Sequence, residues 1–276
     1  MNSATGAGAV LVGGISNTGS GDYHVIGGGW NNMAKGEGAA VGGGKANSAA
    51  GKYSVVAGGT TCTTSGKYSY GGGGGFNTAI GPNTGITGGA TNYASSDGHS
   101  LIHGGNTNSA RGGFSTVGGG LANRALSNYA TVGGGYRNKV NSRFASVPGG
   151  SKNTISGRFG FGMGIASKIS ADYSGAISLT GEECAVRTAN TLGICAEQFL
   201  ITDSGGTTND VVSLISSSRR VLREQEAGKA TLDDVAKSSE ELFKVQDARA
   251  KQIAEMSASV NELAKRVHAI DYASVL

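Results

Sequence analysis

Three side chains with the chemistry of a hydrolase triad lie close together in the sequence: Ser95, Asp97 and His99. A triad needs a nucleophile, a base and an orienting acid, and these come from separated segments of a folded chain. Three residues crowded into one turn do not meet that requirement. We therefore expect no nucleophilic catalysis at this position.

Two histidines four residues apart, His99 and His103, are the best candidates for metal ligands. In a trimer, a histidine near the axis would be presented three times, and three imidazoles can hold a metal ion. His99, however, occupies a position that aromatic residues fill elsewhere in the chain, which favours a packing role. We expect neither a metal nor a cofactor.

Two of the three cysteines, Cys184 and Cys195, are close enough in sequence to form a disulfide. The N-terminal sequence has neither a basic region nor a long apolar core, so it does not resemble a signal peptide. Reduced thiols are the usual state without such a signal, and both states of the pair stay open.

Glycine accounts for 50 of the 276 residues, but its clusters do not match phosphate-binding loops. None precedes a predicted helix in the required way, and no Gly-Lys-Ser/Thr sequence occurs. A glycan-cleaving enzyme needs paired carboxylates, and residues 1–176 hold only 4 Asp and Glu. The glycines lack the three-residue period of collagen, and no apolar stretch is long enough for a transmembrane helix. We expect a non-enzymatic protein without membrane insertion.

The composition of the chain changes near residue 177. Residues 1–176 hold 45 Gly and a net charge of +8, whereas residues 177–276 hold 5 Gly and a net charge of −4. We predict a repeat domain at 1–176, a small β-rich neck at 177–220 and a helical segment at 221–276.

One motif recurs about every 15 residues through the first of these parts. An asparagine follows most glycine clusters, at Asn32, Asn47, Asn77, Asn92, Asn108, Asn123, Asn138 and Asn153. Six residues earlier lies an aliphatic side chain, at Ile26, Val41, Val56, Ile102, Val117, Val132 and Val147. Three residues before that an aromatic ring recurs, at Tyr23, Tyr53, Tyr68, Phe114, Tyr129 and Phe144.

Each repeat contains two short alternating runs separated by glycine turns, which predicts two strands per repeat. Such units form the coils of a β-solenoid, in which equivalent residues stack about 4.8 Å apart. The asparagines would then form a ladder, each side chain bonding the next. Cys62 interrupts this ladder, and we expect it to pack as a small buried thiol.

A coil of 15 residues is thin, and its inner positions are mostly Val and Ala. Such a roll needs a second buried face, and we expect neighbouring subunits to provide it. The aromatic column is the natural candidate, because aromatic rings dominate the burial at interfaces. The alternative is a solvent-exposed aromatic ladder on a monomer.

The sequences GKYSVVAGG at 51–59 and ARGGFSTVGGGLAN at 110–123 resemble the head repeats of trimeric autotransporter adhesins. They are also similar to glycine-rich repeats of bacteriophage and large-virus fibre proteins. The resemblance covers about residues 6–175. It implies an all-β repeat solenoid, namely a left-handed parallel β-roll with three chains packed side by side.

A seven-residue period begins near Thr231 and predicts a C-terminal coiled coil. The seam of the predicted helix is apolar at Ile253, Met256, Val260, Leu263, Val267 and Ile270. This pattern is compatible with a homotrimer. The alternative is a lone amphipathic helix folded back on the neck.

Eight basic residues and no acidic ones lie between positions 111 and 168: Arg111, Arg124, Arg137, Lys139, Arg143, Lys152, Arg158 and Lys168. Tripled around a fibre, they would create a strong positive field. No nucleic-acid-reading module accompanies them, so we expect no specific nucleic acid. Acidic surface glycans, phosphorylated lipid A-type cores and an acidic neighbouring protein fit this field equally, and so does a role in keeping a glycine-rich rod soluble.

These patterns favour a trimeric structural fibre or spike on the surface of a virus particle, most simply a bacteriophage. We expect an adhesive or decorating role toward an anionic host surface, with the helical end joined to other virion proteins. The alternative is a head, neck and stalk fragment of an autotransporter adhesin on the bacterial cell surface.

Overall fold

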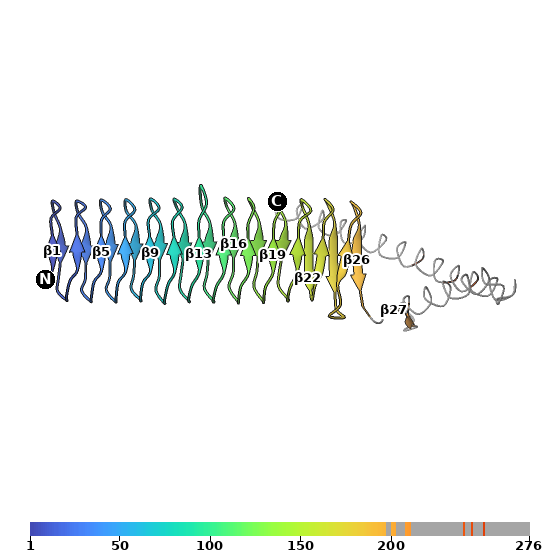
Figure 1. Cartoon of the computed structure of the whole chain (residues 1–276). Helices are drawn as coiled ribbons and strands as arrows, with labels where there is room; N and C mark the ends of the chain where they lie inside the picture. Colours follow the sequence, from blue (N-terminus) through green and yellow to red (C-terminus); the bar gives the residue numbers. More distant parts are fainter. Residues whose placement is uncertain (197–199, 203–207, 211–239, 241–243, 245–250, 252–276) are drawn as a thin grey trace, which may run out of the picture. The chain divides into compact units, whose positions relative to one another are not determined.

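The computed structural model describes residues 1–196, 200–202 and 208–210, together with the single residues Glu240, Lys244 and Lys251. The chain divides into two compact units, Met1–Cys195 and Ala196–Leu276. Unit one contains the whole repeat domain, and its coils lie side by side in chain order from β1 to β26 (Figure 1).

Unit one is a parallel β-solenoid in which two 13-stranded sheets run along the coils. Sheet A consists of β1 (Ser3–Ala4), β3 (Thr18–Gly19), β5 (Met33–Ala34), β7 (Ser48–Ala49), β9 (Thr63–Thr64), β11 (Thr78–Ala79), β13 (Tyr93–Ala94), β15 (Ser109–Ala110), β17 (Arg124–Ala125), β19 (Lys139–Val140), β21 (Thr154–Ile155), β23 (Ser167–Ile169) and β25 (Cys184–Val186). Sheet B consists of β2 (Val10–Leu11), β4 (Val25–Ile26), β6 (Ala40–Val41), β8 (Val55–Val56), β10 (Tyr70–Gly71), β12 (Gly85–Ile86), β14 (Leu101–Ile102), β16 (Thr116–Val117), β18 (Thr131–Val132), β20 (Ser146–Val147), β22 (Phe161–Gly164), β24 (Gly175–Ser178) and β26 (Leu192–Cys195).

The strand register confirms the predicted solenoid with coils of about 15 residues. Val41 pairs with Val56 in sheet B, and Ala34 pairs with Ala49 in sheet A. A third line of isolated parallel bridges follows the coils, from Ile15 to Ile165. The step is 16 residues where Tyr93 pairs with Ser109, and the enlarged turn between β13 and β14 projects beyond its neighbours (Figure 1).

Strands β1 to β21 are only two residues long because each coil reverses through left-handed backbone positions. One is the aromatic column, where Tyr53 has φ 56°, and another immediately precedes the asparagine column, where Thr61 has φ 57°. Glycine is needed where adjacent coils come closest. A Cβ on Gly29 (φ 90°) would lie 2.2 Å from the carbonyl oxygen of Gly44.

The core is a narrow stack of inward columns, and it forms two apolar clusters. One runs from Ile26 to Cys62 and the other from Ala79 to Val186. Every residue of the predicted aliphatic column is fully buried. Between the two clusters, sheet A contributes the buried Thr64 and sheet B contributes Gly71, so the apolar stack is interrupted at this coil.

Inward residues of unusual size are matched by a small residue opposite. His24 is fully buried, and a Cβ on Gly19 would lie 1.8 Å from its Nε2 atom. A Cβ on Gly160 would lie 2.5 Å from the Cγ2 atom of Ile155. Because the coil encloses so little volume, one large side chain is accommodated only where another is removed.

The two sheets continue beyond the expected boundary at residue 176 and reach Cys195. Gly175 pairs with Leu192, a step of 17 residues, so the last coil is longer although the strand pairing is retained. A disulfide joins Cys184 to Cys195 within this coil, with 5.7 Å between the Cα atoms. The first part of the expected neck is therefore a continuation of the solenoid.

In unit two, β27 (Leu200–Thr202) pairs antiparallel with β28 (Thr208–Asp210). Glu240, Lys244 and Lys251 have helical backbone, and Lys244 Nζ lies 3.2 Å from Glu240 Oε1. The predicted coiled-coil seam from Ile253 to Ile270 lies outside the described residues. None of the described helical residues belongs to a helix long and apolar enough to cross a membrane.

Candidate functional site

The residues considered for catalysis lie on the enlarged turn between β13 and β14. The ring of His99 stacks on that of Phe114, with 5.0 Å between the ring centroids. Within the described coils, no hydrogen bond joins Ser95, Asp97 and His99. The part of the chain that the structure describes contains no group of three or more His, Cys, Asp or Glu residues placed to hold a metal ion.

The asparagine column is buried and tied to the backbone of adjacent coils. Asn32 Oδ1 accepts a hydrogen bond from the backbone N–H of Asn47 at 3.0 Å. Asn32 Nδ2 donates to the carbonyl oxygens of Gly28 and Gly44, at 2.8 and 2.9 Å. Most rungs therefore run from side chain to backbone rather than between two amides. This network locks each glycine turn to the next.

Cys62 occupies one position of this column and is buried as a free thiol. Its backbone N–H donates to Asn47 Oδ1 at 2.9 Å, so the side chain of Asn47 keeps its hydrogen bond to the next coil. Its Sγ atom lies 3.6 Å from the carbonyl oxygen of Gly74, a weak contact compared with an amide hydrogen bond.

The aromatic column forms an exposed stack of rings along one turn of the solenoid. His99, Phe114, Tyr129, Phe144, Phe159 and Tyr173 stack in succession, with centroid separations of 4.8–5.1 Å. Tyr53 and Tyr68 form a second stack at 5.4 Å. Each inner ring of the longer stack is therefore packed against the rings of the coils above and below, while its outer edge stays open.

Charged side chains border the aromatic column. Lys52 Nζ lies 2.7 Å from Glu37 Oε2, and Tyr53 Oη donates to Glu37 Oε1 at 3.0 Å. These two hydrogen bonds hold the pKa of the Glu37 carboxyl below its usual value. At the other end, the backbone N–H and the guanidinium of Arg158 both donate to Asp172, which lowers the pKa of that carboxyl.

The eight predicted basic residues lie on two surfaces rather than one. Two of them, Arg143 and Arg158, lie at the aromatic turn, and the Arg143 guanidinium lies 5.4 Å from the ring of Phe144. The other six lie on or beside the outer side of sheet A, at positions that alternate with the buried asparagine and alanine columns: Arg111, Arg124, Arg137, Lys139, Lys152 and Lys168. We call this surface the basic face.

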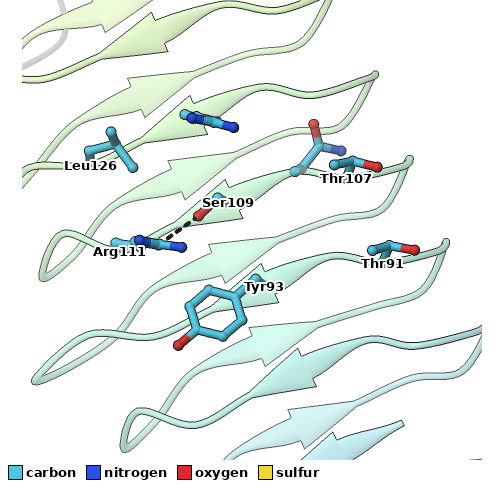
Figure 2. Close-up of a pocket in the computed structure, with 8 residues that line it drawn as sticks. Thr91, Tyr93, Thr107, Ser109, Arg111 and Leu126 are labelled. Atoms are coloured by element: carbon cyan, nitrogen blue, oxygen red, sulfur yellow. Dashed lines mark hydrogen bonds between the residues drawn. The ribbon is translucent and has the colours of Figure 1, made fainter. Parts of the chain in front are cut away.

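A hollow of about 230 Å³ opens on the basic face across β13, β15 and β17 (Figure 2). Its lining residues are Thr91, Tyr93, Thr107, Asn108, Ser109, Arg111, Arg124 and Leu126. Arg111 Nε donates to Ser109 Oγ at 3.2 Å, and the Arg111 guanidinium lies 5.0 Å from the centroid of the Tyr93 ring. Two guanidinium groups, three hydroxyl groups and an aromatic ring therefore surround one small space.

The outer side of sheet B differs from the basic face because it carries no charged residue, and it was not among the surfaces predicted from the sequence. Its outward column contains no charged residue: Val10, Val25, Ala40, Val55, Tyr70, Gly85, Leu101, Thr116, Thr131, Ser146, Phe161, Gly175 and Leu192. The column two residues later contains five glycines among thirteen residues and also lacks Lys, Arg, Asp and Glu. We call this surface the neutral face. The sequence does contain a signal for this face: the residue immediately before each buried aliphatic position is never charged.

A scan against protein-family models finds no match for the chain, and a search of the curated proteins finds none either. Evidence for the function of this chain therefore comes from its aromatic column, its basic face and its neutral face.

Proposed function

We propose that the chain is a non-enzymatic structural protein that forms a homotrimeric fibre or spike on a virus particle, most simply a bacteriophage. In this proposal three left-handed β-rolls pack side by side, and the fibre has an adhesive or decorating role toward an anionic host surface. The observation that supports it best is the contrast between the neutral face and the basic face of one thin solenoid.

The neutral face is suited to contact between copies of the chain. It presents Val, Thr, Gly and aromatic side chains over thirteen strands without a charge, and several of these side chains are exposed. A contact that follows all the coils needs a partner with the same repeat, because a different spacing loses register within a few strands. A second and a third copy of this chain meet that condition.

The aromatic column borders the neutral face, since its turn leads directly into sheet B. Its rings are already stacked along the column, and Lys and Arg side chains lie over several of them. We therefore propose that the neutral face forms the centre of the contact and that the aromatic column forms its margin. Aromatic and cationic side chains are common in that combination at interfaces.

The basic face then points away from the trimer and is repeated three times around it. Weak contacts to a polyanionic surface gain strength from such repetition through effective concentration. The helical end in unit two would join other virion proteins. The resemblance to adhesin heads supports the same arrangement, with the repeat domain distal.

The mass of the soluble protein tests the trimer directly, and two matched threonine variants test the face. Thr116 lies on the neutral face and Thr78 on the basic side, and both are half-buried in the isolated chain. Thr116→Asp should break the trimer, because three carboxylates would be buried in one contact at a cost of several kcal/mol. Thr78→Asp should leave its mass unchanged, and the reverse pattern would refute this choice of face.

The adhesin-fragment alternative differs in its location. Electron microscopy with an antibody to this chain should label fibres on a virus particle. Labelling of the bacterial cell surface in the absence of particles would favour the alternative.

A further inference from the structure

We propose that the hollow on the basic face is a binding site for one acidic sugar unit of a polyanionic glycan, with Arg111 and Arg124 as the residues that bind its acid group. This inference rests on the adhesive role proposed above and assigns that role to a defined place. The chemistry is that of a carboxylate or sulfate carried on a ring with several hydroxyl groups.

Charge at the hollow favours an anion. Within the described coils neither Arg111 nor Arg124 forms an ion pair, and Lys139 lies directly beside Arg124 in the strand register. No Asp or Glu lines this hollow, and Asp97 lies instead in an adjoining hollow that also includes Arg111. Placing like charges on adjacent strands is destabilising, so this arrangement has a cost that a bound anion would offset.

The position of Arg111 is fixed before any ligand arrives. Its Nε atom donates to Ser109 Oγ, and its guanidinium lies against the Tyr93 ring. A planar guanidinium held in this way loses little conformational freedom when its remaining N–H groups donate to a carboxylate or sulfate. Figure 2 shows Arg111 and Tyr93 at the same side of the hollow, with Thr91 and Thr107 at the other.

The rest of the lining suits a sugar ring. The Thr91 hydroxyl can donate and accept, the Thr107 hydroxyl donates to Asn106 Oδ1 and can still accept, and Ser109 Oγ accepts from Arg111 and can still donate. Leu126 provides an apolar patch. The volume of about 230 Å³ lies below the ~300–1,000 Å³ of pockets for drug-sized ligands, so it fits a single small unit.

A nucleic acid is the competing class of polyanion, and the hollow suits it less well. Single strands bind through aromatic faces on which successive bases stack. The guanidinium of Arg111 lies over the Tyr93 ring, 5.0 Å from its centroid, so that ring already has a partner. The basic face continues beyond the hollow to Lys139, Lys152 and Lys168, but of its cations only Arg111 and Arg124 line the hollow.

Binding of defined polymers to the full-length protein tests the site. The probes are a polyuronate, a sulfated polysaccharide, neutral dextran and duplex DNA, measured by calorimetry at about 0.15 M ionic strength. We expect binding of at least one acidic polysaccharide and none of dextran. Arg111→Gln and Arg124→Gln should each weaken that binding by roughly tenfold to a hundredfold, the range for a lost charge-assisted hydrogen bond.

Lys35→Gln is the matched control, because Lys35 is exposed and occupies the repeat position of Arg111 in an early coil, outside the hollow and away from the aromatic turn. It should weaken binding less than about threefold, as expected for an exposed charge acting at a distance. Equal losses in all three variants, no binding of either acidic polysaccharide, or tighter Arg124-dependent binding of DNA would each overturn the site. The mass of each variant, measured in parallel, shows separately whether the trimer of the proposed function holds.

Discussion

Replacing Cys62 with asparagine should stabilise the solenoid. In the central coils, Cys62 is the one position at which the buried asparagine column lacks an amide side chain. The backbone around position 62 already has the geometry that accepts this side chain in other coils. The neighbouring Asn47 donates to the carbonyl oxygens of Gly43 and Gly59 at 2.8 Å each. The amide in Cys62→Asn would reach the corresponding carbonyl oxygens of Gly58, four residues earlier, and of Gly74 in the next coil.

The size of the gain follows from the number of new hydrogen bonds. The amide in Cys62→Asn would make two donor bonds and would also accept from the backbone N–H of Asn77, as Asn77 does for Asn92 at 3.0 Å. Three neutral hydrogen bonds contribute about 0.5–1.5 kcal/mol each. Ordering the amide costs up to about 1 kcal/mol. We expect the free energy of unfolding to rise by about 1–3 kcal/mol.

Urea unfolding followed by circular dichroism measures this change, at one fixed protein concentration because the proposed assembly would contribute to stability. Cys62→Ala is the control, since it removes the thiol without supplying any hydrogen-bond donor, and it should give no gain. Asn92→Cys should produce a loss of similar size in another coil. A Cys62→Asn protein no more stable than the parent, alongside a destabilised Asn92→Cys protein, would refute the reasoning.

Three further changes test the core and the last coil. Gly19→Ala should lower the free energy of unfolding by about 1–3 kcal/mol, because its Cβ would clash with the ring of His24, and adding His24→Ser should recover most of the loss in a double-mutant cycle. Val132→Asp should cost several kcal/mol by burying a carboxylate, and a thermal midpoint within a few degrees of the parent would contradict its inward position. Cys184→Ser should cost roughly 2–4 kcal/mol by opening the disulfide to Cys195, and a reducing agent should have the same effect on the parent but none on the variant.

The fold could be predicted from the sequence because one set of residue types recurs at a fixed step. Valine or isoleucine at the same place in each repeat can be buried together only if the repeats stack, so the period predicts the coil. The end of the solenoid could not be predicted in this way. Strand pairing continues to Cys195 by backbone hydrogen bonds, which do not require the glycine motif that disappears near residue 177.

The bonding of the asparagines was predicted only in part. Their regular spacing indicates a column, but an amide can bond either to the next amide or to the next backbone. The left-handed residue that precedes each asparagine, such as Ala46 before Asn47, turns the backbone N–H of that asparagine toward the side chain of the coil below. That choice depends on backbone angles, and the residue types at those positions vary too much to indicate it.

The outer surfaces of the solenoid can differ because the residue types in one outward column do not restrict those in another. Stability comes from the inward columns and from the asparagine rungs, so the outward residue of a strand is free to serve another purpose. At such outward positions sheet A carries Arg124 and Lys139 on adjacent strands, and sheet B carries Thr116 and Thr131. Chance variation of surface residues would scatter charge over both sheets. Basic side chains gather on the sheet A side only between Arg111 and Lys168, whereas the outward column of sheet B lacks charge over all thirteen strands, which fits the proposal that the two sides meet different partners.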